Sequence, residues 1–322
     1  MDTTAKEIVF TTTGCNFCDA ARMSVALLPE STPIIKAGRR YDCLIGLSGG
    51  ADSSTALVMA VKQLGLRPLC FSIDTGYNKP EADENIMRLV EGLRVPFFRY
   101  NINLNNFKAM QGAFLRAGVK NVEIPTDHVL MAASYELAAK YGIKTIISGG
   151  NVATESIMPA SWGHNARDLT HIKDIYRGSY KGLPTCGILK WNWYRWVRGI
   201  KIVYPLDSVN YNRNTAIESL KKDFGFKDTG EKHEENYFTW WFQNFYLFEK
   251  FGIDKRKAHY SSLIVSGQMD RKDALQRLDE SPVYPELGIE ARVLKYPKHE
   301  HSDYKMDKWY DRIAKIVRLC KF

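Results

Sequence analysis

The sequence predicts an α/β protein, with a doubly wound parallel sheet followed by a mainly helical C-terminal part. Apolar runs typical of buried strands alternate with helix-forming segments between residues 41 and 148, and this alternation is typical of parallel sheets covered on both faces. Beyond about residue 151, apolar strands become rare and aromatic residues cluster. The expected strands are 41–47, 68–73, 96–102 and 144–148, and the expected helices are 52–64, 81–93 and 129–140.

This change of pattern divides the chain of 322 residues into three regions. We expect an N-terminal segment at 1–38, a sheet domain at 39–160, and a helical substrate or partner region at 161–322 packed on the sheet. No apolar run approaches the roughly 20 residues that cross a bilayer, and the first residues lack a signal-peptide layout. We therefore expect a cytoplasmic protein with no membrane partner.

Charge and cysteine content narrow the class of partner. The net charge of +9 suits anionic partners such as nucleotides, nucleotide-linked sugars or RNA, although it is equally consistent with simple solubility. Six cysteines are too few for a disulfide scaffold in a chain of this length. Four of them stand alone (Cys43, Cys70, Cys186 and Cys320), while Cys15 and Cys18 form a CxxC pair.

The most informative loop follows the first expected strand of the sheet, in the string LIGLSGGADSSTALVMA at residues 44–60. A strand that ends in Ser48-Gly49-Gly50 and runs into a helix presents backbone N–H groups at the helix N-terminus, which is an anion site. The lysine-containing Walker loop and the GxGxxG fingerprint are absent here, so the loop suits a diphosphate. Asp52 could bring in Mg²⁺ or cap the helix. A plain strand-to-helix turn is the alternative.

The string SGGADS at residues 48–53 resembles the SGGxDS signature of the PP-loop ATP pyrophosphatases. That resemblance implies a sheet of the PP-loop, adenine nucleotide alpha hydrolase type, with ATP and Mg²⁺ as cofactors. Relatives split ATP into AMP and pyrophosphate, adenylylate an oxygen of the substrate, and let a nitrogen or sulfur nucleophile displace AMP. The loop residues Ser48, Gly49, Gly50, Asp52, Ser53 and Ser54 would then hold the phosphates.

Two further strand ends fit a nucleotide site. Asp74 and Thr75 follow the second expected strand, and Gly149 and Gly150 follow the fourth. Ligands of open α/β sheets bind beyond the carboxyl ends of strands, so we expect these residues near ATP. Simple turns are the alternative at both places.

Two long strings, residues 123–163 and 230–275, resemble the N-acetyl sugar amidotransferases of lipopolysaccharide and O-antigen biosynthesis. The resemblance implies that the acetamido group of a UDP-linked sugar is adenylylated and converted by ammonia into an acetamidino group. We recognise no glutaminase signature in this chain. The family resemblance implies separate partners, similar to the glutaminase and cyclase subunits of imidazole glycerol phosphate synthase, as the source of ammonia.

Site residues are assigned partly by this resemblance and partly by residue type. Candidate catalytic residues are Asp52, Ser53, Lys232 and His233, and candidate substrate-binding residues are Asp127, His128, Asn151, Lys255 and Arg256. Histidine titrates near neutral pH, so His128 or His233 could move a proton. A solvated charged face, a helix cap or a structural histidine is the alternative reading for these residues.

The Cys15–Cys18 pair has three possible roles. Relatives usually carry two such pairs, whose four thiolates would form a closed zinc site. Residues 1–4 align with the end of the first segment, so this chain offers half of a possible Zn²⁺ site. The other readings are an unliganded pair and redox or sulfur chemistry.

The alternative function is tRNA thiolation or another RNA modification by a PP-loop enzyme. It would use the net charge of +9 and the CxxC pair as a sulfur carrier. We recognise no appended RNA-binding module, and the C-terminal strings resemble the sugar enzymes, so we expect no nucleic-acid partner. A non-catalytic partner-binding protein is a second alternative, against which the intact SGGADS loop argues.

Overall fold

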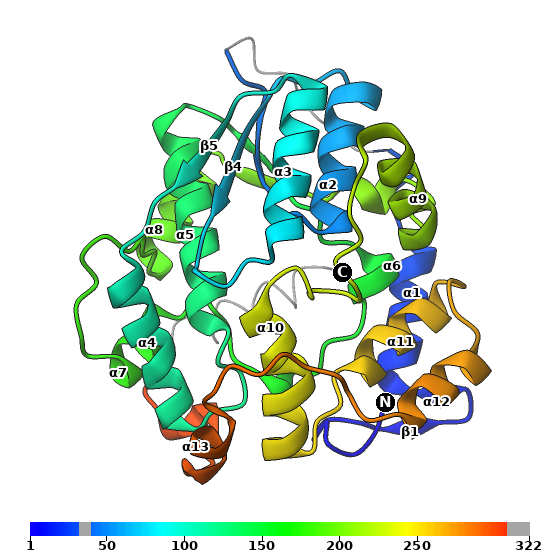
Figure 1. Cartoon of the computed structure of the whole chain (residues 1–322), viewed down its shortest axis with the longest axis vertical. Coiled ribbons are helices and arrows are strands. Elements are labelled where there is room, and N and C mark those ends of the chain that lie inside the picture. The colour runs from blue at the N-terminus through cyan, green and yellow to red at the C-terminus, as the bar shows by residue number, and fades with distance from the viewer. Residues whose placement is uncertain (32–39, 308–322) are drawn as a thin grey trace.

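The central feature of the computed structural model, which describes residues 1–31 and 40–307, is a five-stranded parallel sheet (Figure 1). Its order is β5–β4–β3–β6–β7, and every neighbouring pair is parallel. The strands are β3 (Cys43–Gly46), β4 (Pro68–Ile73), β5 (Phe97–Tyr100), β6 (Thr145–Ile147) and β7 (Lys201–Val203). Strands β4 and β5 follow β3 on one side, and strands β6 and β7 lie on the other side of β3. The topological switch point therefore lies between β3 and β6.

Alternation along the strands builds a separate core on each face of this sheet. Cys43 and Ile45 lie in one hydrophobic cluster, while Leu44 between them lies in the other. Ile146 and Ile147 divide in the same way. Successive strand residues point to opposite faces, so strands that are apolar throughout need helices on both sides. The doubly wound α/β fold predicted from the sequence is therefore confirmed.

Helices cover the two faces in different combinations. On one face lie α2 (Ala51–Val58), α3 (Pro80–Leu93) and α9 (Arg213–Phe224). On the other lie α4 (Leu104–Ala117) and α5 (Ile124–Lys140). Helix α5 begins before the expected residue 129 because Pro125 occupies its first turn, where the missing N–H costs no hydrogen bond. The expected helix at 52–64 is α2 continued by a π-helical turn at Met59–Gln63.

The chain beyond residue 151 is mainly helical, with one exception that the sequence reasoning missed. It forms α6 (Val152–Glu155), α7 (Leu169–Ile175), α8 (Ile188–Asn192), α10 (Tyr237–Trp241), α11 (Arg256–Val265), α12 (Arg271–Asp279) and α13 (Glu290–Lys295). It also supplies β7, so the sheet draws on both the predicted sheet domain and the predicted helical region. A run of three residues, Lys201 to Val203, is too short to give a strand pattern. The predicted boundary at 38/39 and the single Cys320 lie outside the described residues.

The N-terminal segment folds onto the C-terminal helices. A short hairpin of β1 (Phe10–Thr11) and β2 (Gly14–Cys15) leads into α1 (Asn16–Ala26), which contacts α11 and α6. Across residues 1–31 and 40–307, we find no helix that combines the length and the apolar character needed to cross a bilayer.

Buried histidines anchor the end of the described chain. His171 Nε2 lies 3.0 Å from His301 Nδ1, and the backbone N–H of Asn121 donates to His301 Nε2 at 3.1 Å. His164 lies beside them, with its Nε2 2.9 Å from a carboxylate oxygen of Asp168. Burial and neighbouring imidazoles lower the pKa of His171 to about 4 and that of His301 to about 3. The His171 and His301 side chains are therefore neutral at physiological pH.

Candidate functional site

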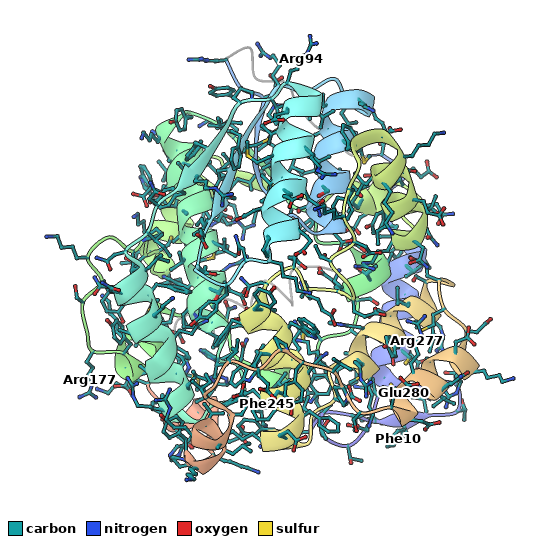
Figure 2. The ribbon with its side chains drawn as sticks, in the orientation of Figure 1. Phe10, Arg94, Arg177, Phe245, Arg277 and Glu280 are labelled. Carbon is teal, nitrogen blue, oxygen red and sulfur yellow. The ribbon has the colours of Figure 1, made fainter. Side chains whose placement is uncertain are left out.

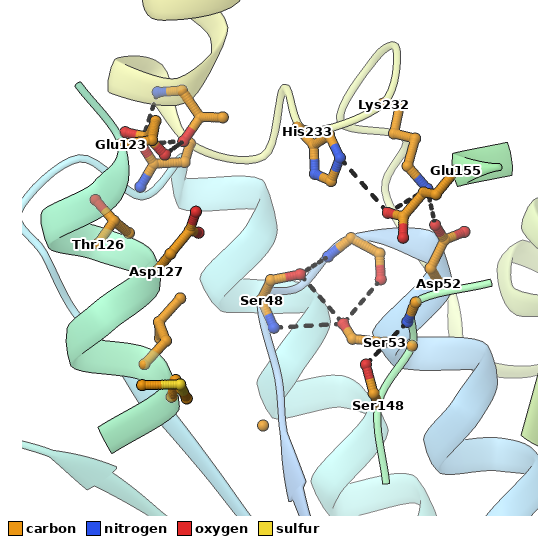
Figure 3. A pocket seen from close by; sticks show the side chains of 18 of the residues that line it. Ser48, Asp52, Ser53, Glu123, Thr126, Asp127, Ser148, Glu155, Lys232 and His233 are labelled. Carbon is orange, nitrogen blue, oxygen red and sulfur yellow. Dashed lines mark hydrogen bonds and ion pairs between the residues drawn. The ribbon is translucent and has the colours of Figure 1, made fainter. Parts of the chain in front are cut away.

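A pocket of about 980 Å³ opens at the carboxyl ends of β3, β4 and β6, at the switch point of the sheet (Figure 3). Its walls come from the loop after β3, the amino-terminal half of α5, the loop after β6 and the C-terminal part of the chain. Eleven of the residues singled out from the sequence line it: Ser48, Gly50, Asp52, Ser53, Thr75, Asp127, Gly149, Gly150, Lys232, His233 and Lys255. The fold thus brings together residues as far apart in sequence as Ser48 and Lys255, which are 207 positions apart.

The loop between β3 and α2 holds its shape through glycine and serine. Gly49 has φ +79°, and a Cβ there would lie 2.1 Å from the carbonyl oxygen of Ala82, so only glycine fits. The Ser48 N–H donates to Ser53 Oγ at 3.3 Å, and the Gly50 N–H donates to Ser48 Oγ at 3.3 Å. These contacts leave the N-terminus of α2 facing the pocket, as a phosphate site requires.

The loop after β6 packs directly on this loop. A Cβ on Gly149 would lie 2.6 Å from the backbone nitrogen of Ser53, so glycine permits the close approach. Asn151 caps α6 by accepting from the Thr154 N–H at 2.9 Å, and its Nδ2 donates to the Gly149 carbonyl at 3.2 Å. Asn151 is buried and does not line the pocket. Its predicted role in binding substrate is therefore replaced by a role in shaping this loop.

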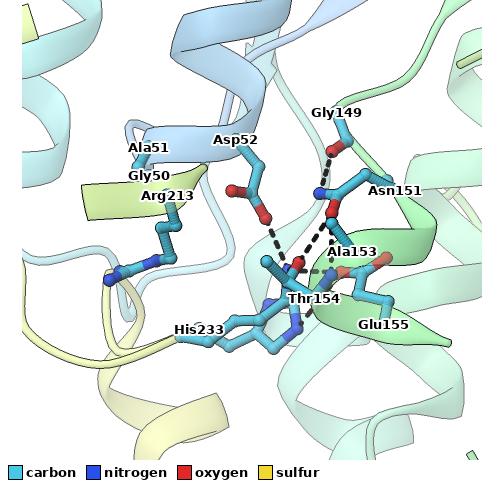
Figure 4. A network of polar contacts seen from close by, with 12 residues as sticks. Gly50, Ala51, Asp52, Gly149, Asn151, Ala153, Thr154, Glu155, Arg213 and His233 are labelled. Atoms are coloured by element: carbon cyan, nitrogen blue, oxygen red, sulfur yellow. Dashed lines mark hydrogen bonds and ion pairs between the residues drawn. The ribbon is translucent and has the colours of Figure 1, made fainter. Parts of the chain in front are cut away.

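A network of charged side chains lies beside the two loops (Figure 4). Lys232 Nζ lies 2.5 Å from Asp52 Oδ2 and 2.9 Å from Glu155 Oε1, and it donates to Thr154 Oγ1 at 2.6 Å. The Tyr211 hydroxyl donates to the other Asp52 oxygen at 2.5 Å. Burial opposes ionisation of Asp52, but the Lys232 charge and the two hydrogen bonds outweigh it and lower its pKa. The same carboxylates raise the pKa of Lys232 against the effect of burial.

Asp52 and Glu155 are the residues that fit a magnesium ion. Their carboxylates converge on one cationic group, Lys232 Nζ, and carboxylate oxygens are the ligands that Mg²⁺ takes from proteins alongside phosphate oxygens. Glu155 was missed in the sequence reasoning. It lies one helical turn beyond Asn151 at the carboxyl end of β6, so the rule that ligands bind at strand ends would have found it.

A segment of the C-terminal part, residues 232–236, covers the phosphate loop. A Cβ on Gly50 would lie 2.8 Å from the Glu235 carboxylate, and the Lys79 N–H donates to the Glu235 carbonyl at 2.9 Å. His233 adopts φ +67°, and its Nε2 lies 3.6 Å from Glu155 Oε1. Burial and the nearby Lys232 charge lower the pKa of His233, so the neutral imidazole is the form that faces the pocket.

The opposite wall of the pocket carries two carboxyl groups from α5 and the residue before it (Figure 3). Burial and the nearby Asp127 raise the pKa of Glu123 to about 8, and desolvation by the pocket walls raises that of Asp127 to about 6. The Thr239 hydroxyl donates to Glu123 Oε2 at 2.8 Å. Lys255 lines the same region, and burial lowers its pKa. Glu123 had escaped the sequence reasoning because a single glutamate before a helix carries no motif.

Three other predicted site residues lie away from the pocket. His128 is fully buried, and its ring nitrogens meet the Ala166 carbonyl at 2.6 Å and the Cys186 N–H at 3.2 Å, so it is a structural histidine. Arg256 pairs with Asp254 at 2.8 Å and lines a neighbouring pocket. Asp74 is exposed and closes its own turn by accepting from the Gly76 N–H at 2.7 Å. These three are corrections to the expected site.

Two residues of the predicted phosphate loop, Gly49 and Ser54, do not face the pocket. Gly49 faces Ala82, and Ser54 is buried within α2. Their contribution to the site is to its backbone, since neither lines the pocket.

The Cys15–Cys18 pair gives no support for zinc. The two sulfur atoms lie 3.6 Å apart in the hairpin and first turn of α1, and neither lines the pocket. Burial and the neighbouring thiol raise the pKa of Cys18. Within residues 1–31 and 40–307, no three His, Cys, Asp or Glu side chains form a group that could hold a metal ion.

Two family models match separate parts of the chain. The model described as NAD synthase matches residues 34–186, and the model described as LPS biosynthesis protein WbpG-like, C-terminal domain, matches residues 235–296. The NAD synthase match places residues 34–186 in the PP-loop ATP pyrophosphatase superfamily. Members of that superfamily use ATP and Mg²⁺.

Individual relatives of this PP-loop chain are distant. An uncharacterised protein of Methanocaldococcus jannaschii is 26% identical over 117 residues, which span 35% of this chain and 40% of that relative. The NMN synthetase of Francisella tularensis is 17% identical, covers 82% of this chain and 92% of its own, and has a TM-score of 0.44. A U34-tRNA thiolase of Methanococcus maripaludis is 10% identical, with coverages of 88% and 89% and a TM-score of 0.35.

Proposed function

We propose that this enzyme is an amidotransferase that converts the N-acetyl group of a nucleotide-linked sugar into an acetamidino group for lipopolysaccharide or O-antigen biosynthesis. The observation that carries the proposal is the position of the WbpG-like region. Its residues Asn236, Thr239, Phe242 and Lys255 line the same pocket as the phosphate loop. The part of the chain that resembles a lipopolysaccharide enzyme thus forms one wall of the pocket that the phosphate loop also lines.

In the proposed first step, the acetamido oxygen attacks the α-phosphorus of ATP and pyrophosphate leaves. The N–H groups of the loop at residues 48–53 and the N-terminus of α2 would stabilise the charge that develops on the leaving group. Asp52 and Glu155 would hold Mg²⁺, which supplies further charge compensation. Lys232, which pairs with both carboxylates, would add positive charge on the same side of the leaving group.

In the proposed second step, ammonia attacks the carbon of the O-adenylyl imidate, the C–O bond breaks, and AMP leaves. Ammonium must lose a proton before it attacks, and the raised pKa of Asp127, about 6, makes this carboxylate a stronger base than usual. Thr239 and Lys255 would contact the acceptor on the same wall. We propose that separate glutaminase- and cyclase-like subunits supply the ammonia, and that the reaction takes place in the cytoplasm, where ATP is the co-substrate.

The test is nucleotide product analysis with the full chain, Mg²⁺-ATP and ammonium. UDP-N-acetyl sugars, UDP-N-acetyl uronic acids and bulk tRNA are supplied in separate reactions. We expect AMP and pyrophosphate with one of the sugar nucleotides only, and a sugar product about 1 Da lighter because NH replaces O. AMP formed only with tRNA would overturn the proposal in favour of RNA modification. Asp52→Asn serves as the control that loses turnover, and Asp74→Asn as the matched control that retains it.

A further inference from the structure

We propose that one exposed helical face, formed by Leu189, Trp193, Trp196 and Val197, docks this protein on an anionic lipid surface. These side chains are 83%, 44%, 75% and 70% exposed. They occupy α8 and the π-helical turn Trp193–Val197 that continues it, and spacings of four, three and one place them on one side of the helix. We call them the outer face. The inference does not depend on the proposed reaction.

The inner face of the same helix has an ordinary structural role. Trp191 and Tyr194 are buried, and the Tyr194 ring stacks on Tyr135 of α5 at 5.6 Å (Figure 1 shows α8 beside α5). A surface helix of a globular protein normally turns polar residues to water. Packing in the core explains why the inner face is aromatic. It does not explain why the residues of the outer face, which are exposed, are apolar.

The surroundings of the outer face are strongly basic. Residues 188–206, which hold this helix and β7, contain four cations and no acidic residue, the cations being Lys190, Arg195, Arg198 and Lys201. Arg195 lies 5.6 Å from the Trp196 ring, and Arg198 lies 5.5 Å from the Trp193 ring. Figure 2 shows Arg177 projecting into solvent beside α7, away from α8, where it pairs with Asp174. The Glu136 carboxylate acts on this helix at Tyr194, on the inner face.

A bilayer surface matches this combination better than a protein partner. Leu189 and Trp196 keep most of their surface free, so they protrude and would need a matching socket on a protein, whereas the head-group layer yields to an inserted side chain. Tryptophan favours the membrane–water interface, and lysine and arginine favour anionic head groups. Ten helical residues span about 15 Å, half a bilayer, so the helix would lie in the interface plane.

The placement is compatible with catalysis. The helix leads into the amino end of β7, whereas the ATP pocket opens at the carboxyl ends of the strands, where Tyr204 follows β7. A surface bound at the helix therefore leaves the pocket mouth free. The inference departs from the expectation that this chain has no membrane partner, because burial separates the aromatic residues of 191–196 into two faces that the sequence alone could not assign.

The test is co-sedimentation of the full chain with vesicles of phosphatidylcholine alone and of phosphatidylcholine mixed with phosphatidylglycerol. We expect binding to the anionic vesicles that weakens with salt, a blue shift of tryptophan fluorescence, and little binding to the neutral vesicles. Trp196→Ser combined with Val197→Ser should lower the partition coefficient at least about ten-fold. Leu275→Ser on α12, which removes another exposed apolar side chain (51% exposed), should leave binding unchanged. Thermal unfolding of each variant checks that it is folded.

Two results would overturn the inference. In the first, the wild type and the Trp196/Val197 variant bind anionic vesicles to the same extent, or neither of them binds these vesicles. Alternatively, sedimentation velocity could show a dimer that the same variant dissociates, which would make a second copy of the chain the occupant of the outer face. Because no step of this test uses ATP or a sugar, its failure leaves the proposed amidotransferase reaction untouched, and failure of that reaction leaves the vesicle result standing.

Discussion

Replacing Lys232 by methionine tests whether this side chain neutralises the two carboxylates at the ATP site. The Lys232 side chain is 8% exposed and that of Asp52 is 17% exposed, with 2.5 Å between Nζ and Oδ2. Removing one partner of a buried ion pair leaves an uncompensated charge and costs about 3 to 5 kcal/mol of unfolding free energy. We expect Lys232→Met to lose an amount in this range, measured by urea denaturation at pH 7 without Mg²⁺.

The double variant Lys232→Met/Asp52→Asn separates loss of charge balance from loss of packing. It leaves no unpaired charge at Asp52, so we expect it to be more stable than Lys232→Met alone by about 2 kcal/mol. Mg²⁺ should raise the melting temperature of Lys232→Met but not of the double variant, since only the former keeps both carboxylates. Lys221→Met, which removes an exposed partner of Asp228, should change stability by less than about 1 kcal/mol. Equal stability of the single and double variants would refute the reasoning.

Three further predictions address the remaining parts of the site and its support. Glu155→Gln should raise the Mg²⁺ concentration for half-maximal ATP turnover about ten-fold or more, and an unchanged Mg²⁺ dependence would exclude Glu155 as a ligand. Gly149→Ala, whose Cβ meets the Ser53 backbone, should lower ATP turnover about a hundred-fold, whereas Gly187→Ala, which meets only Leu169 at an ordinary 3.5 Å, should not. The pKa of His171 lies at about 4, below the ordinary 6.5, because of burial. The unfolded chain therefore takes up the proton first, and unfolding free energy should fall from pH 6.5 downward, by about 2 kcal/mol at pH 5. Urea titrations should show a shallower fall for His171→Asn, and an identical fall would contradict the assignment.

Local sequence was sufficient to predict the phosphate loop and four of the five strands of the sheet. Gly49 and Gly50 interrupt an apolar run at the point where β3 becomes α2, and no other residue type fits at Gly49. The central strands β3 and β4 are buried on both faces, so their apolar patterns are continuous and easily recognised. The two glycines after β6 carry the same information, and Gly149 indeed approaches the phosphate loop.

The contacts that complete the site could not be predicted from local sequence, although the family resemblance had singled out Lys232 as a candidate. Tyr211 and Lys232 reach Asp52 from positions more than 150 residues away, and only the folded chain brings them together. His128 shows the opposite failure, because its residue type suggested proton transfer while its ring is satisfied by backbone groups in the core. Residue type gives the chemistry that a side chain can perform, but burial and hydrogen-bond partners decide whether it is free to perform it.

The C-terminal region cannot be regarded as a separate substrate domain beside a self-sufficient ATP domain. Lys232 and Arg213 line both the ATP pocket and the neighbouring pocket of about 970 Å³, and the backbone after β4 pairs with the segment around Asn236. Without this region, the phosphate loop would lose the cation that balances Asp52, and the loop would be open to water. The charge balance at Asp52 is therefore set by the segment that directly precedes the WbpG-like region at residues 235–296, so ATP and an acceptor bound there would each change the electrostatic environment of the other.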